Sequence, residues 1–134
     1  MSVYQTLLPS ASRTTTQTSP DIDTLGFRSL IVTLDVTVVG TGSITVTINR
    51  KDIASGKYIL ILAGLAVITA VTNSYKVTPG EIAAVANVSA VDVLPQTIQV
   101  VVTANNANPV TYSLGIDLVD GGVGLAQGQG GGLR

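Results

Sequence analysis

Alternation of apolar and polar residues is the feature that most constrains how this chain can fold. From Leu30 to Val38 every second residue is apolar, and Thr33, Asp35 and Thr37 stand between them. Because successive side chains of a β-strand point to opposite faces, a period of two predicts a strand with one buried face.

The same period recurs along most of the chain. Alternating or β-prone runs occupy residues 3–8, 44–48, 75–78, 98–102 and 110–118, and the last of these is the cleanest. The runs 30–38 and 44–48 are separated only by Gly40-Thr41-Gly42. Two alternating runs around a short loop that contains glycine predict a β-hairpin.

One apolar run, residues 58–71, is long enough to raise the question of a membrane. It has 14 residues, whereas a spanning helix needs about 20. We therefore expect no membrane association. A strand, or two strands joined by a bend near Gly64, buried on both faces, is the better interpretation.

Six or more short strands, tight polar turns and almost no helical periodicity predict an all-β fold. A sandwich, a jelly roll and a barrel share this pattern. We expect a single antiparallel β-sandwich, jelly-roll-like, over residues 25–120, because the connections are too short for parallel crossovers. Within it, residues 81–94 fit no single period and are expected to be irregular or a short strand.

Both ends of the chain differ from its middle. Residues 9–24 lack apolar spacing, so we expect residues 1–24 to be a first strand followed by an extended arm or a long loop. Seven of the 14 glycines fall in residues 121–134, which predicts a flexible tail. Such a tail is either disordered or an arm that orders against a neighbouring subunit. Mobility alone suggests these partner-binding residues: Arg13, Thr14, Thr15, Thr16, Leu133 and Arg134.

Composition limits the partners that this chain can have. Hydrophobic residues make up 46% and charged residues 11% of its 134 residues, whereas roughly 25% charged is typical of soluble domains. A net charge of −1 leaves little self-repulsion, so we expect a homo-oligomer or a larger assembly. The seven Lys and Arg residues are scattered, so nucleic-acid binding is not expected.

The residue types that usually serve in catalysis or metal binding are either absent or not grouped in a known motif. The chain has no cysteine and no histidine, which removes thiolate ligands and the commonest general base. Asp21 and Asp23 lack the spacing and the glycine of an EF-hand loop, and no lysine follows Gly40-Thr41-Gly42 at P-loop spacing. Asp35 and Asp117 lie on outward strand faces. We therefore expect no enzyme activity, no catalytic residues, no cofactor and no metal.

Several blocks together resemble a known family. The alternating block 31–48, the segments 51–58 and 75–80, and Val93-Leu94-Pro95 leading into 98–103 and 111–115 are similar to small β-rich virion structural proteins of tailed bacteriophages. These include capsid decoration, or cement, proteins. The resemblance covers residues 7 to 119. The chain departs from it after Pro95, where it has Gln-Thr-Ile in place of an aromatic residue.

The resemblance implies a protein of the virion that sits on the outer capsid surface and bridges copies of the major capsid protein. The alternative is a tail or adhesin component that binds host carbohydrate or another tail protein. Sugar-binding platforms favour exposed aromatic rings, and this chain has no Trp, one Phe and four Tyr. We therefore rank the capsid role first.

Overall fold

The computed structural model describes residues 2–80 and 83–120, which form ten β-strands and no helix. The strands are β1 (Ser2–Arg13), β2 (Gln17–Thr18), β3 (Ile22–Asp23), β4 (Ser29–Val38), β5 (Ile44–Lys51), β6 (Tyr58–Ala63), β7 (Thr72–Thr78), β8 (Ser89–Val91), β9 (Thr97–Ala104) and β10 (Val110–Val119). The all-β prediction is confirmed. The tail expected at 121–134 lies outside the described residues, as do its Leu133 and Arg134.

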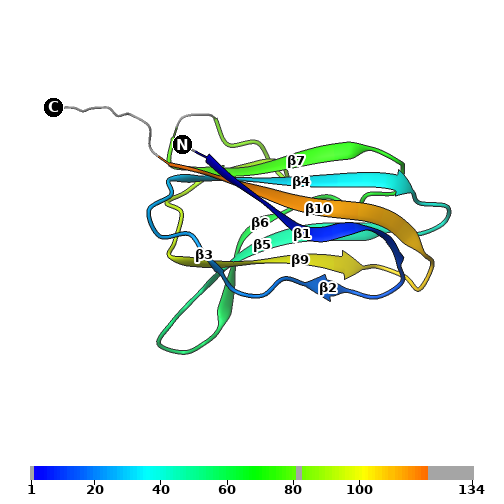
Figure 1. Cartoon of the computed structure of the whole chain (residues 1–134), viewed down its shortest axis with the longest axis horizontal. Coiled ribbons are helices and arrows are strands. Elements are labelled where there is room, and N and C mark those ends of the chain that lie inside the picture. The colour runs from blue at the N-terminus through cyan, green and yellow to red at the C-terminus, as the bar shows by residue number, and fades with distance from the viewer. Residues whose placement is uncertain (1, 81–82, 121–134) are drawn as a thin grey trace, which may run out of the picture.

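The strands form two sheets (Figure 1). One has the order β1-β10-β4-β7-β8, and the other has the order β2-β9-β5-β6 with β3 also paired to β9. All neighbours are antiparallel except β7 and β8, which run parallel. The expectation of antiparallel pairing throughout is wrong there, because the connection 79–88 is long enough to bring the chain back beside Lys76. The three residues of β8 then run alongside Lys76 to Thr78, the end of β7, in the same direction.

One hydrophobic core lies between the sheets and takes side chains from both. The predicted inward faces are largely confirmed: Leu30 to Val36, Ile44 to Ile48, Ile98 to Val102 and Val110 to Leu118 are buried at every second position. Val38 is the exception and is 58% exposed, since the register between β4 and β10 shifts just before it.

The predicted hairpin between residues 30–38 and 44–48 is wrong. β4 pairs with β10 and β7, whereas β5 pairs with β9 and β6. The turn closes with a 2.8 Å bond from Gly42 N–H to the Val39 carbonyl, and it carries the chain from one sheet to the other. The two strands present their apolar faces to the same core instead of sharing an edge.

Residues 9–24 are more ordered than an arm or a long loop. β1 runs to Arg13 and pairs with β10 along its length, with two register shifts on the way. β2 and β3 then pair with β9. The segment lacks apolar spacing because only a few of its residues, such as Ile22, reach the core, and backbone pairing to two sheets holds the rest.

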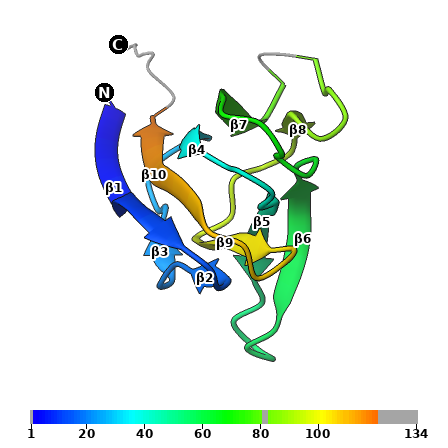
Figure 2. The ribbon, with the colours of Figure 1, turned by 90° about the vertical axis from the view of Figure 1, so that its right-hand side faces the viewer.

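The apolar run 58–71 is not buried on both faces. Its one strand, β6, ends at Ala63 just before Gly64, and β6 is an edge strand in which only Leu62 is buried. Figure 2 shows β6 at the rim of its sheet, with the β5–β6 hairpin extending beyond the rest of the fold. No helix among the described residues is long and apolar enough to cross a membrane.

Candidate interaction surface

The crossover from β6 to β7, residues 64–71, turns apolar side chains toward solvent. Leu65 is 69% exposed and Ile68 is 64% exposed. Val67 is the buried apolar side chain of the crossover, and it fixes the crossover to β5 through backbone bonds of 2.7 and 3.3 Å with Ile44. The crossover is therefore held in place while most of its side chains remain accessible.

An open hollow of about 420 Å³ lies beside the crossover. We call it, with the exposed crossover side chains, the apolar hollow. It lies between the crossover, the start of β7 and the segment that leads into β8. Its lining residues are Leu65, Ala66, Val67, Ile68, Thr69, Val71, Asn73, Ser74, Tyr75, Asn87 and Val88. None of these is charged, so the hollow suits an apolar or neutral polar group.

Asn87 fixes one wall of the hollow. Its backbone has a positive φ of 64°, a conformation that asparagine tolerates better than most residues. Its Nδ2 donates a 2.9 Å hydrogen bond to the carbonyl of Ala63 at the end of β6. The segment before β8 is thereby attached to the other sheet.

Two further polar groups lie in the hollow. Asn73 Nδ2 makes a long 3.5 Å contact with the Tyr75 hydroxyl. Burial raises the pKa of the Tyr75 phenol, so the hydroxyl is protonated at neutral pH and can donate. An incoming group with an oxygen atom would find donors here beside an apolar wall.

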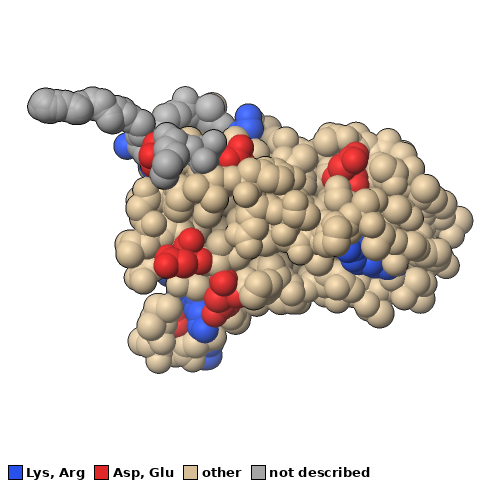
Figure 3. All heavy atoms as spheres, in the orientation of Figure 1, with Lys and Arg blue, Asp and Glu red and all other residues tan. Residues whose placement is uncertain are grey.

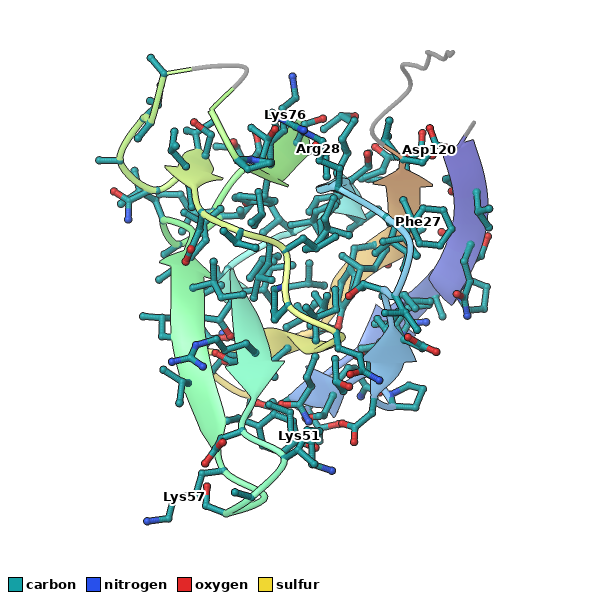
Figure 4. The ribbon with its side chains drawn as sticks, turned by 90° about the vertical axis from the view of Figure 1, so that its left-hand side faces the viewer. Phe27, Arg28, Lys51, Lys57, Lys76 and Asp120 are labelled. Atoms are coloured by element: carbon teal, nitrogen blue, oxygen red, sulfur yellow. The ribbon has the colours of Figure 1, made fainter. Side chains whose placement is uncertain are left out.

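Charged side chains lie mostly elsewhere. Much of the face in Figure 3 carries no charge. Some of the charges that it shows lie at the lower left, near the β5–β6 hairpin, and others lie at the upper left and on the right-hand part of the face. Figure 4 shows Lys51 and Lys57 at this hairpin, at the opposite end from Arg28, Lys76 and Asp120. Contact with the apolar hollow therefore depends little on charge.

A polar cluster ties the hairpin to the body of the fold. Lys51 Nζ lies 2.8 Å from Asp21 Oδ2, and the Tyr58 hydroxyl donates a 2.5 Å bond to Asp21 Oδ1. These two bonds, that from Lys51 first, lower the pKa of Asp21, and the bond to Asp21 raises the pKa values of Lys51 and Tyr58. The Asp21 carboxylate is thus already paired with Lys51 and Tyr58.

Comparisons of the chain with models of protein families, with curated proteins and with solved structures found no match. Function is therefore inferred from the surfaces of the molecule. Over residues 2–80 and 83–120, no group of three or more Asp, Glu, His or Cys side chains is placed to hold a metal ion.

Arg13, predicted to bind a partner, is engaged within the fold. Its guanidinium donates to the carbonyls of Tyr112 at 2.7 Å and Pro9 at 2.5 Å, and lies 4.9 Å from the centre of the Tyr112 ring. These contacts fasten the end of β1 to β10. A role for Arg13 with a partner remains a prediction and would require breaking them.

Thr14, Thr15 and Thr16 are exposed at the turn after β1. Thr15 accepts hydrogen bonds from Gln17, and Thr16 Oγ1 accepts a 3.0 Å bond from the Ala104 amide on β9. The apolar hollow lies on the far side of β5, so the structure does not bring these threonines to it.

The two outward carboxylates do not form a pair. Asp35 lies opposite Ser113 and accepts a 2.8 Å bond from Thr72, whereas Asp117 lies opposite Ile31. Positions 113 and 117 of β10 are four residues apart, which is about 13 Å along a strand. Asp117 Oδ1 is buried without a hydrogen-bond partner among the described residues.

Proposed function

We propose that this chain is a non-enzymatic virion structural protein, a capsid decoration (cement) protein that binds the outer capsid surface and stabilises the lattice of the major capsid protein. The observation that carries the proposal is the apolar hollow, a fixed and uncharged surface on a chain with few charges. Exposed apolar surface gathered in one place supports contact with another protein.

The strand order supports a fold suited to this role. We infer that the two sheets form a β-sandwich of the jelly-roll type. If β2 and β3 count as one strand and the short β8 is set aside, the first, eighth, third and sixth strands form one sheet. The second, seventh, fourth and fifth form the other, which is the order of two interleaved Greek keys. Jelly rolls occur in viral capsid and lectin domains, an analogy of fold and not of site.

Energetics favours many weak contacts over one strong one. Removing apolar surface from water contributes roughly 25 cal/mol per Å², and the cost of ordering two partners offsets much of that gain. A decoration protein meets the same capsid surface many times, so modest contacts with neighbouring copies add through effective concentration. Such binding needs shape and apolar area more than charge.

Co-sedimentation tests the proposal directly. The purified protein is mixed with empty capsids assembled from the major capsid protein of the virus that encodes it, and bound protein is measured against free protein. We expect saturation at a fixed ratio to capsid subunits. A protein that stays in the supernatant at all concentrations contradicts the capsid role.

A matched pair of variants tests the apolar hollow. Ile68→Lys places a charge in it, and Leu25→Lys places the same charge on a loop residue that is 69% exposed beyond β3. We expect the first to weaken capsid binding at least tenfold and the second to leave it unchanged. Equal binding by both variants would show that another surface contacts the capsid.

The alternative is a tail or adhesin component that binds carbohydrate. Its support is weaker because the two exposed tyrosines, Tyr4 on β1 and Tyr58 on β6, belong to different sheets and form no shared platform. A glycan array distinguishes the roles, since a protein that clamps a capsid lattice should bind no sugar on it.

A further inference from the structure

The edge strands of the two sheets differ in how they are protected against pairing with another chain. β1 contains Pro9 and two register shifts. β8 has three residues, and β2 and β3 have two each. Prolines, irregular register and short length are common ways to block an edge. β6, with six residues, has neither proline nor charge.

The backbone groups that β6 leaves open follow from its ladder with β5. The Asp52 amide donates a 2.8 Å bond to the Lys57 carbonyl, and Arg50 lies opposite Ile59. Because hydrogen-bonded and non-bonded pairs alternate in an antiparallel ladder, the N–H and C=O groups of Tyr58 and Leu60 point away from β5.

The open stretch has definite limits. The register between β5 and β6 shifts after Leu60, and the Ala63 carbonyl already accepts the bond from Asn87. At the other end the Tyr58 ring is held by Asp21, with Lys51 Nζ 5.7 Å from its centre. Lys51 lies on β5, and Asp21 lies beyond β5 on the side away from the open edge of β6. The Tyr58 ring therefore points toward β5 and leaves the open edge of β6 uncovered.

We propose that β6 pairs antiparallel with β6 of a second copy of this chain, about a twofold axis at Ile59, so that two sheets become one. In this register Tyr58 lies opposite Leu60 of the second copy. The N–H of each of these two residues donates to the C=O of the other, and the same pair of hydrogen bonds repeats on the other side of the twofold axis. Ile59 meets Ile59 of the second copy in a non-bonded pair, where side chains are closest.

A second copy fits this edge because the register is self-complementary. Tyr58, Ile59 and Leu60 are 40%, 40% and 58% exposed, and pairing covers all three with the same residues. Lys57 would face Ile61 of the second copy, so no like charges oppose each other. The net charge of −1 adds little repulsion. The proposal does not depend on the capsid role, because no capsid residue enters it.

A disulfide test gives the sharpest measurement, since the chain has no cysteine of its own. Opposed residues in a non-bonded antiparallel pair have Cα atoms about 4.5 Å apart, which suits a disulfide. With oxidised glutathione as oxidant, we expect Ile59→Cys to form a covalent dimer. Ile53→Cys, which puts the same change on a residue that is 68% exposed in the same hairpin, should not. Equal crosslinking of both variants, or of neither, overturns the proposal.

The cysteine-free protein provides a second measurement. Sedimentation equilibrium should show a concentration-dependent dimer, and a monomer at concentrations up to about 1 mM overturns the proposal. Leu60→Pro removes an N–H group that points away from β5, a place where an edge strand tolerates proline. It should fold with an unchanged circular dichroism spectrum and remain a monomer, whereas Leu60→Val should still dimerise. A dimer that survives Leu60→Pro would have to use another surface.

Discussion

Gly64 lies against the ring of Tyr75, so that a Cβ atom at position 64 would come within 2.7 Å of Cε1 of that ring. Gly64 directly follows β6 of one sheet, and Tyr75 lies in β7 of the other. The approach is possible because glycine has no side chain. This contact sets where the crossover begins and where the Tyr75 ring stands in the apolar hollow.

Gly64→Ala should therefore destabilise the fold. The added methyl group forces the buried Tyr75 ring to shift, and overpacking of this kind costs about 1–3 kcal/mol. Urea denaturation of the variant should show a lower midpoint with an unchanged slope. In a Tyr75→Leu background, where the ring is gone, the additional loss from Gly64→Ala should be clearly smaller. Equal losses in both backgrounds would mean that the ring is not the obstacle.

The sequence predicts the strands and their faces well, because alternation is a local property. The faces of β9 and β10 are as expected from Ile98 to Val102 and from Val110 to Leu118. Which strands pair with each other is less predictable. The runs around Gly42 have the pattern of a hairpin, yet they face each other across the core, and alternation is the same in both arrangements.

The apolar hollow was not predicted, although its residues were conspicuous in the sequence. The apolar run 58–71 predicts a buried strand, but composition does not distinguish a central strand from an edge strand. Edge position depends on which strand pairs beyond β6, which is a long-range property. The predicted partner residues came from expected mobility, and Arg13 shows that a segment without apolar spacing can still be fixed by hydrogen bonds.

Arg13→Ala should loosen the end of β1. Its guanidinium satisfies backbone carbonyls and packs over Tyr112, and hydrogen bonds to charged groups contribute about 1.5–3 kcal/mol. We expect a loss of about 1–3 kcal/mol by denaturation. Arg13→Lys should recover little of this stability, since an ammonium lacks the planar fork of donors with which the guanidinium reaches both carbonyls. Arg50→Ala, at an exposed position, should change stability by less than about 0.5 kcal/mol.

Ser19→Ala tests how the chain passes from β2 to β3 along β9. The Ser19 hydroxyl accepts a 3.0 Å bond from the buried Val100 amide, and the Ser19 amide donates a 2.9 Å bond to the Val100 carbonyl. Alanine leaves the Val100 N–H without a partner, which costs about 1–3 kcal/mol. Hydrogen exchange at the Val100 amide should become faster. Thr18→Ala, one residue away and exposed, is the matched control and should leave that amide unchanged.

Asp21→Asn should change how stability depends on pH. The bonds from Lys51 and Tyr58 lower the pKa of Asp21, so their stabilisation is present above the unfolded value of about 3.9 and is lost as pH falls through the lower folded value. The raised pKa values of Lys51 and Tyr58 act at the other end. Their stabilisation is present below the unfolded values of about 10 and is lost as pH rises through the folded ones.

The melting temperature of Asp21→Asn should consequently fall furthest below that of the unsubstituted protein between about pH 4 and pH 10, and the two should converge outside this range. All three groups are at the surface, so the shift should be small and should shrink further in high salt. In a Lys51→Met, Tyr58→Phe background the substitution should have little effect, because Asp21 has lost both partners. A constant difference from acid to alkaline pH would show that the cluster does not couple the hairpin to the body of the fold.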